Sequence, residues 1–167
     1  MKLIIHDLEK EGLSSNMLPS TEDVKIITED SIIHNCIGCF GCWLKTPGKC
    51  VLKDNYDNMG ELLSKCHELI IISRCIYGSY SPFIRNILDR SISFLLPYFA
   101  EINGETHHKN RYNNQFTLTA HFYGDDITKA ERETAKALVT ANGINFYSSG
   151  NKAYFHDRLQ SIKERLQ

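Results

Sequence analysis

Short apolar runs alternate with amphipathic segments along most of this chain. Runs rich in β-branched or alternating apolar residues predict β-strands at Lys2–His6, Val24–Thr28, Leu69–Ile72, Gln115–Phe122 and Ile144–Tyr147. The run Leu69–Ile72 is apolar on both faces, which is typical of a strand in the middle of a parallel sheet covered by helices. The pattern therefore predicts a layered fold built around a buried sheet.

Helices are expected between these strands. Apolar residues three and four positions apart predict helices over Asp57–Cys66, Phe83–Phe94, Asp126–Asn142 and Asp157–Leu166. The third of these helices begins with the S/T-x-x-E pattern of a capping box, and an Asn-Gly pair predicts its end.

The alternation of strands and helices predicts an α/β fold with a five-stranded parallel sheet in the order 2-1-3-4-5. In such sheets ligands bind beyond the carboxyl ends of the strands, at the switch between strands 1 and 3. The chain has 167 residues and no internal repeat, which indicates a single domain over residues 1–167.

Composition narrows the functional classes. Hydrophobic residues make up 42% of the chain and charged residues 23%, as in ordinary soluble globular proteins. The formal net charge is −1, which gives no electrostatic basis for binding nucleic acid or a membrane surface. We find no signal peptide and no membrane span, so the six cysteines indicate a reducing cytoplasm, where clustered thiols bind metals or carry redox chemistry more often than they form disulfides.

Four of the six cysteines fall close together in one loop. Cys36, Cys39, Cys42 and Cys50 have the spacing C-x2-C-x2-C-x7-C, and the glycines between them allow tight turns. Soft thiolates at this spacing suit an iron–sulfur cluster or a zinc ion. The alternative is a loop of reduced thiols that only pack against their neighbours.

The remaining polar or reactive residues are expected to have structural roles. Pro97–Asn114 is polar with scattered aromatic residues and predicts a long loop. The pair His107-His108 in it could bind a metal, but it is expected to be solvated, because closed metal sites without a third protein ligand are rare. Asp89 and Arg90 are expected to form a surface ion pair. Cys66 lies on an apolar helix face and is expected to pack in the core.

The cysteine loop also carries a resemblance to a known family. With Trp43-Leu-Lys-Thr-Pro-Gly48 inside it, the loop resembles that of flavodoxin-like NAD(P)H-dependent FMN reductases and iron–sulfur flavoproteins. The segment Cys75-Ile-Tyr-Gly-Ser79, followed by Ile87-Leu-Asp-Arg90, is similar to the family's flavin-contacting turn and next helix. The resemblance covers most of residues 24–147. It implies a flavodoxin-like three-layer sandwich, an FMN cofactor and electron transfer from NAD(P)H through flavin to an acceptor.

The same resemblance implies particular site residues and partners. One turn and the end of the fourth strand would contact the flavin ring, and in the iron–sulfur branch the four loop cysteines would hold a [4Fe–4S] cluster. The implied partners are a nicotinamide cofactor and an electron acceptor, with a homodimer as an open alternative. The implied flavin contacts come from Ile76, Tyr77, Gly78, Ser79, Thr119, His121 and Gly124.

The first loop departs from the family pattern. A Ser/Thr/Gly/Arg-rich loop after strand 1 would hold the FMN phosphate with free N–H groups at a helix N-terminus. Here Asp7, Glu9 and Glu11 stand in that place and would repel a dianion, while Ser14–Asn16 come later. Weak FMN binding is therefore expected. Two non-enzymatic alternatives remain: a metal- or cluster-binding module of the same fold, and a degenerate member that acts only as an interaction partner.

Overall fold

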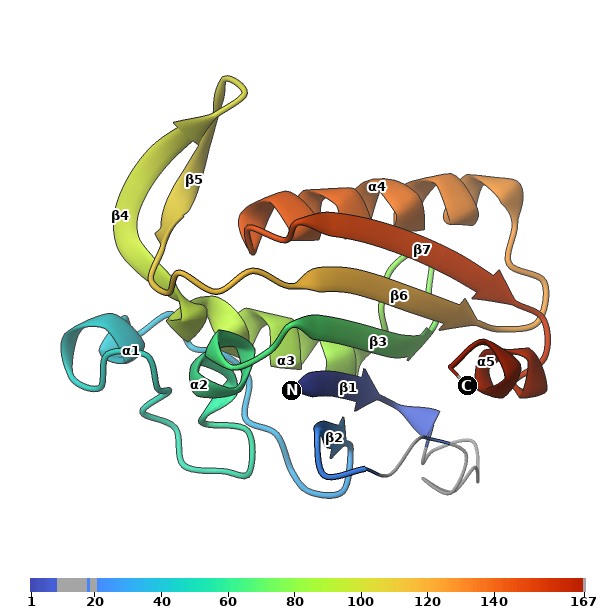
Figure 1. Cartoon of the computed structure of the whole chain (residues 1–167), viewed down its shortest axis with the longest axis horizontal. Helices are drawn as coiled ribbons and strands as arrows, with labels where there is room; N and C mark the ends of the chain where they lie inside the picture. Colours follow the sequence, from blue (N-terminus) through green and yellow to red (C-terminus); the bar gives the residue numbers. More distant parts are fainter. Residues whose placement is uncertain (9–17, 19–20, 167) are drawn as a thin grey trace.

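The computed structural model describes residues 1–8, 18 and 21–166. Its main sheet has five parallel strands in the order β2-β1-β3-β6-β7 (Figure 1). The predicted α/β class and strand order are confirmed, and β3 lies inside the sheet between β1 and β6. The strands are β1 Lys2–His6, β2 Val24–Thr28, β3 Glu68–Arg74, β6 Thr117–Tyr123 and β7 Gly150–His156.

One face of the sheet holds the larger core. Alternate residues of the two central strands, Leu3, Ile5, Leu69 and Ile71, are fully buried on this face. Cys66 packs in the same core, as predicted. Because these side chains come from adjacent strands in register, they form a continuous apolar surface for the helices. The helices on this face are α2 Met59–Ser64, α3 Pro82–Arg90 and α4 Lys129–Asn145.

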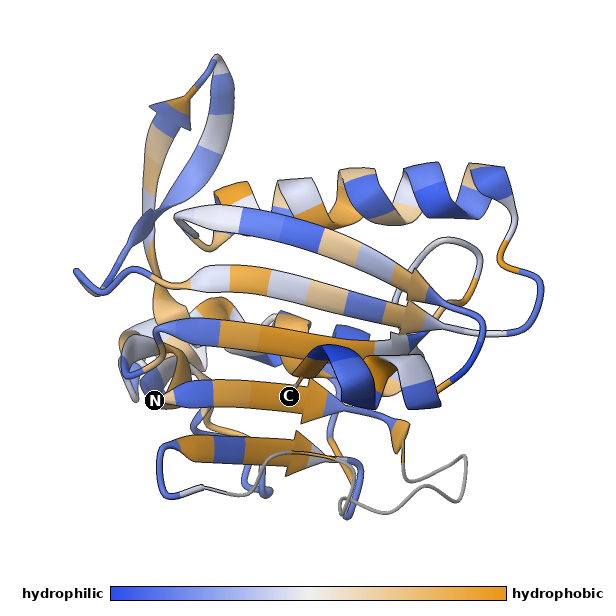
Figure 2. Ribbon diagram, turned by 45° about the vertical axis from the view of Figure 1, so that its right-hand side comes forward, coloured by the Kyte–Doolittle hydropathy of each residue, from blue (hydrophilic) through white to orange (hydrophobic). Residues whose placement is uncertain are grey.

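A second apolar cluster covers the other face of the sheet. Ile4, Ile70 and Ile72 pack there with Ile162 of the short helix α5 Gln160–Leu166. Figure 2 shows α5 in front of β1 and β3, which are mostly apolar, with α3 and α4 behind the sheet. Helices therefore flank the sheet on both sides.

The end of α4 differs from the prediction. Asn142-Gly143 does not end this helix, which continues to Asn145, so the strand expected at Ile144–Tyr147 is wrong. The fifth strand is β7 instead. A Cβ on Gly143 would stand 2.8 Å from Asn151 Nδ2 and 2.9 Å from Ser148 Oγ. The glycine that suggests a helix end in the sequence is therefore a close-packing position against the start of β7.

The insertion predicted as a loop is a β-hairpin. Strands β4 Leu95–Ile102 and β5 Glu105–Asn110 pair antiparallel and project away from the main sheet (Figure 1). Between them Asn103 and Gly104 both have left-handed backbones, with φ of 53° and 83°. A two-residue type I′ turn requires this geometry and favours Asn-Gly. The long loop expected over Pro97–Asn114 is therefore wrong.

The helices before this hairpin are shorter than predicted. Pro82 occupies the first turn of α3, where its missing N–H has no intrahelical partner to lose. The helix ends at Arg90 and is followed by a short 3-10 helix, Ser91–Phe94. Among the described residues, no helix is long and apolar enough to cross a membrane.

The start of α4 offers a test of its local stability. Glu131 N donates to Thr128 Oγ1 (3.3 Å) and Thr128 N donates to the Glu131 carboxylate (2.9 Å), which confirms the predicted capping box. Thr128→Ala should lower the free energy of unfolding by about 1 kcal/mol, because it removes the cap. Urea denaturation followed by circular dichroism measures this. Thr134→Ala, at an exposed position within the helix, is the matched control, and an equal loss in both variants would contradict the capping role.

Candidate functional site

The cysteine loop folds back on itself at one end of the molecule. It contains the short helix α1 Gly41–Leu44. Gly48 N donates to Cys42 O (3.1 Å), and Cys50 N donates to Asp57 O (2.8 Å). The first bond returns the chain to Cys42 shortly before Cys50, and the second ties Cys50 to the segment that precedes α2.

All four cysteines of this loop line one cavity of about 580 Å³. Cys36 and Cys39 are exposed, Cys42 is half-buried and Cys50 is buried. Burial raises the pKa of the Cys42 thiol, and negative charge on the other three cysteines raises it further. Cys42 is therefore close enough to the other three thiols to interact with them electrostatically. We name the space that all four line the cysteine cavity.

A zinc ion and an iron–sulfur cluster place different demands on four thiols. Within the part of the chain that the structure describes, no three His, Cys, Asp or Glu side chains are arranged to hold one metal ion. A zinc site draws four ligand atoms to about 2.0–2.3 Å from a single ion. In a [4Fe–4S] cluster each cysteine binds its own iron, so the thiolates converge less tightly. In the described residues the four thiols therefore line one cavity without forming a single-ion site.

A buried ion pair lies beside the cysteine cavity. The Arg90 side chain, which lines the cavity, is 0% exposed and donates two hydrogen bonds to the Asp54 carboxylate, at 2.8 and 3.0 Å. Its terminal N–H groups also donate to His34 O (2.8 Å) and Leu52 O (3.2 Å). The expected surface pair of Asp89 and Arg90 is therefore wrong, because Arg90 points into the protein.

Several hydrogen bonds also fix the Asp54 carboxylate, the partner of Arg90. Its carboxylate accepts hydrogen bonds from His34 N (3.1 Å) and Tyr56 N (2.9 Å) as well as from Arg90. Burial alone would raise the pKa of Asp54, but these hydrogen bonds outweigh burial and hold the pKa below its usual range. The pair is therefore ionised at neutral pH, and it joins the segments on both sides of the cysteine loop to α3.

Aromatic side chains form another wall of the cavity. Trp43 lies against Phe40 and His108, with ring centroids 5.5 and 4.9 Å apart. Its indole Nε1 donates to Leu95 O (2.9 Å), which fixes α1 to the start of the hairpin. The histidine pair expected to be solvated is not: His108 lines the cavity, and His107 is buried.

The turn implied to contact flavin lies beyond the carboxyl end of β3. Tyr77 is 89% exposed and has a left-handed backbone, with φ of 52°. Ile76 and Ser79 exchange two backbone hydrogen bonds of 2.9 Å, which close the turn on itself. A Cβ on Gly78 would stand 2.8 Å from Thr134 Cβ, so α4 fills the space beside this glycine.

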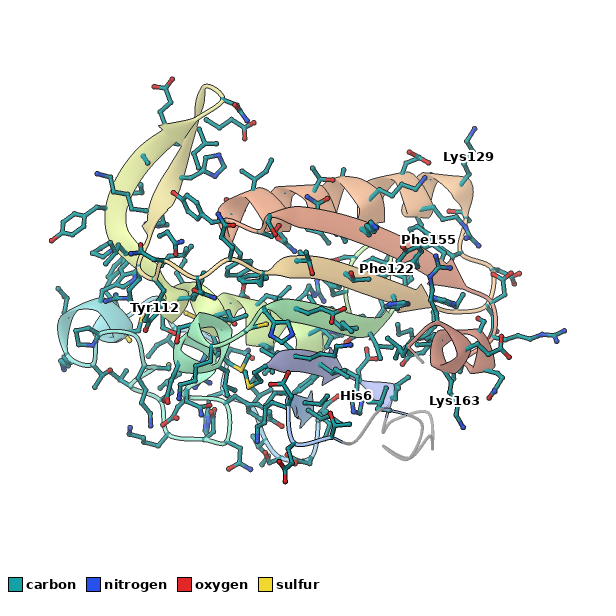
Figure 3. All side chains as sticks on the ribbon, in the orientation of Figure 1. His6, Tyr112, Phe122, Lys129, Phe155 and Lys163 are labelled. Carbon is teal, nitrogen blue, oxygen red and sulfur yellow. The ribbon has the colours of Figure 1, made fainter. Side chains whose placement is uncertain are left out.

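The turn and the cysteine cavity lie at opposite ends of the sheet. Helix α3 begins at Pro82, just after the turn, and ends at Arg90, on the cavity. Its nine residues span about 14 Å at the usual rise of an α-helix. In Figure 3 the labelled Tyr112, which packs beside Gly48, lies toward the cysteine end. The labelled His6, the last residue of β1, lies toward the other end. The structure therefore does not bring the implied flavin contacts and the cysteines into one site.

The other implied flavin contacts belong to β6 and the residue after it. Thr119 lies in the middle of the strand. His121 is buried, and its Nδ1 lies 3.0 Å from His156 Nε2. Gly124 follows the strand and lines a small cleft with Arg74 and His156. His121 and Gly124 therefore both lie beside His156, whereas Thr119 lies earlier in the strand.

Asp7 occupies the switch point between β1 and β3. This buried carboxylate accepts hydrogen bonds from Arg74 N (3.1 Å), Tyr123 OH (2.9 Å) and Ser73 Oγ (3.4 Å). Burial raises the pKa of Asp7. These N–H and O–H groups could otherwise donate to a bound phosphate. Here they donate to the Asp7 carboxylate instead. The other residues expected to shape this loop lie outside the described part of the chain: Glu9, Glu11 and Ser14–Asn16.

The buried histidine pair predicts a pH dependence of stability. Burial, together with positive charge on His156 and Arg165, lowers the pKa of His121 to about 4. An unfolded histidine has a pKa of about 6.5, so the unfolded chain takes up this proton first as the pH falls. The stability contributed by neutral His121 is therefore present above about pH 6.5 and is lost toward pH 4, by up to about 1.4 kcal/mol per pH unit.

Urea denaturation at several pH values between 4 and 7 measures this loss. The variant His121→Leu removes one of the two titrating histidines and should reduce the dependence of the unfolding free energy on pH. An unchanged slope in the variant would contradict the assignment to His121.

Comparison with known proteins assigns no family to this geometry. No protein-family model matches the chain, and no curated protein matches it. The function proposed below therefore rests on the chemistry and contacts of the described residues.

Proposed function

We propose that this chain is a flavodoxin-like redox protein that holds an iron–sulfur cluster on Cys36, Cys39, Cys42 and Cys50. The observation that carries the proposal is the gathering of four thiols around one cavity beside the buried guanidinium of Arg90. The parallel sheet with helices on both faces supports the flavodoxin-like assignment. A cluster held by four cysteines would supply one-electron transfer.

The donor set and its surroundings fit such a group. Thiolates are the soft ligands that iron–sulfur clusters use, and all six cysteines of the chain are free. Buried Cys50 would anchor the protein side of the cluster, and exposed Cys36 and Cys39 would leave a rim open to an electron-transfer partner. The positive charge of Arg90 would offset part of the negative charge that four thiolates bring.

The proposed role is electron transfer in a reducing cytoplasm. Such a compartment keeps the loop cysteines as thiols, the state in which they can take up iron. The protein's own contribution is to position the thiols, to shield one side of the site with Trp43 and His108, and to supply a fixed positive charge.

Metal analysis tests the cluster directly. Protein reconstituted anaerobically with iron and sulfide should contain about four irons per chain and show a broad brown absorption, because four cysteines can hold a four-iron cluster. Cys42→Ser should lose most of the iron, since it removes one of the four proposed ligands.

Cys75→Ser is the matched control. Cys75 is also half-buried, but it lies beyond β3 and outside the cysteine cavity, so this variant should keep the full iron content. Wild-type protein that binds no iron, or that binds one zinc ion per chain instead, would overturn the proposal.

The exposed ring of Tyr77 favours a second candidate function, that of an FMN-dependent oxidoreductase. This ring stands beyond the carboxyl end of β3, the edge at which open α/β sheets bind ligands. Electrons would pass from NAD(P)H through flavin to an acceptor. Asp7 opposes tight phosphate binding there, because its carboxylate takes nearby donors and would repel a dianion.

Flavin titration tests this second candidate. Riboflavin and FMN should bind with similar affinity, because the FMN phosphate would gain few of the charge-assisted hydrogen bonds that are worth about 1.5–3 kcal/mol each. Asp7→Asn should strengthen FMN binding more than riboflavin binding, since it removes the repulsion and keeps the size of the side chain. Fluorescence quenching measures both affinities, and a strong preference of the wild-type protein for FMN would contradict this view of Asp7.

A further inference from the structure

Arg90 carries one N–H donor that its protein neighbours leave unused. An arginine has five N–H donors in a rigid planar fork. In Arg90 the two terminal nitrogens make four hydrogen bonds, two to Asp54 and one each to His34 O and Leu52 O. The fifth donor, at Nε, is buried and has no hydrogen-bond partner among the described residues.

An unused donor of this kind requires an explanation. Buried N–H groups in native structures nearly always have partners, and a charged group pays the largest penalty when it lacks one. The guanidinium plane cannot turn away, because Asp54 and two backbone carbonyls fix it. Since Arg90 lines the cysteine cavity, the missing acceptor is expected to be a group held in that cavity.

Cys50 is placed to provide this acceptor. It is buried and lines the same cavity as Arg90. The Cys50 sulfur lies close enough to the Arg90 guanidinium to interact with it electrostatically. A neutral thiol is a weak acceptor, whereas a thiolate bound to a metal is deprotonated and carries negative charge. Arg90 would therefore gain its fifth partner when Cys50 becomes a ligand.

We propose that Arg90 Nε donates a hydrogen bond to the sulfur of Cys50 in the cluster-loaded protein, and that this bond raises the reduction potential of the cluster. The inference rests on the proposed cluster and deepens it. Hydrogen bonds to the sulfurs are among the factors that set cluster potentials. The reduced form has one more negative charge, so a fixed cationic donor stabilises it more than the oxidised form. Arg90 is therefore a tuning residue and not a ligand.

Two variants separate this role from the structural role of the ion pair. Arg90→Lys keeps the positive charge but loses the planar fork. The double variant Asp54→Asn with Arg90→Met removes every guanidinium donor and leaves no buried charge without its partner. Arg85→Lys and Arg85→Met, at an exposed position of the same helix, are the matched controls.

Redox titration of the anaerobically reconstituted proteins, followed by visible absorption and electron paramagnetic resonance, measures the effect. In the double variant the ratio of reduced to oxidised cluster at a given potential should fall at least tenfold, a shift of about 59 mV to lower potential for a one-electron couple. Arg90→Lys should shift the potential in the same direction by less. The Arg85 variants should match the wild type.

The possible failures are distinguishable. Equal potentials in the wild type and the double variant, at equal iron content, would overturn the role of Arg90 and leave the cluster proposal intact. Loss of iron in the double variant, with an unchanged potential of the clusters that remain, would also overturn it, because Arg90 would then have only a structural role. Wild-type protein that binds no iron would overturn both proposals together.

Discussion

The buried ion pair of Arg90 and Asp54 is the interaction on which the cysteine end of this molecule depends. Arg90 belongs to a helix that covers the sheet, Asp54 follows the last cysteine of the loop, and His34, whose carbonyl accepts from Arg90, precedes the first. One guanidinium therefore fixes both ends of the cysteine loop against the core. Removing either partner of such a pair costs about 3–5 kcal/mol, because the other charge is left buried alone. The loop and the helix are thus held together as one unit.

The two ends of the sheet offer opposite chemistry. At the carboxyl ends of the strands, where open α/β sheets usually bind ligands, the carboxylate of Asp7 accepts bonds from Arg74 N and Tyr123 OH. At the other end a fixed cation, Arg90, faces four thiols. The first end therefore disfavours an anionic ligand, whereas the second places a buried N–H donor, Arg90 Nε, on the cavity that the four thiols line. The cysteine cavity is therefore the stronger candidate for a functional site.

The sequence predicted what depends on local patterns and missed what depends on packing. Leu69–Ile72 is apolar on both faces, and it lies inside the sheet. Asn142-Gly143 looks like a helix end, but packing against β7 keeps it helical. Asn103-Gly104 is a sequence signal for a hairpin turn. The polar residues on both sides of it hide the apolar pattern that predicts strands. The cysteine spacing of Cys36–Cys50 indicated the candidate site, whereas its partner Arg90 could be found only by noting that it falls on the apolar stripe of its helix.

The central claim is that the cysteine loop holds an iron–sulfur cluster, and X-ray absorption at the iron edge of the anaerobically reconstituted protein tests it most directly. The account predicts that every iron is bonded to sulfur alone and has other irons as its next neighbours. Iron bonded to oxygen or nitrogen, without neighbouring irons, would contradict the account, because the metal would then be bound adventitiously and the four thiols around Arg90 would only pack.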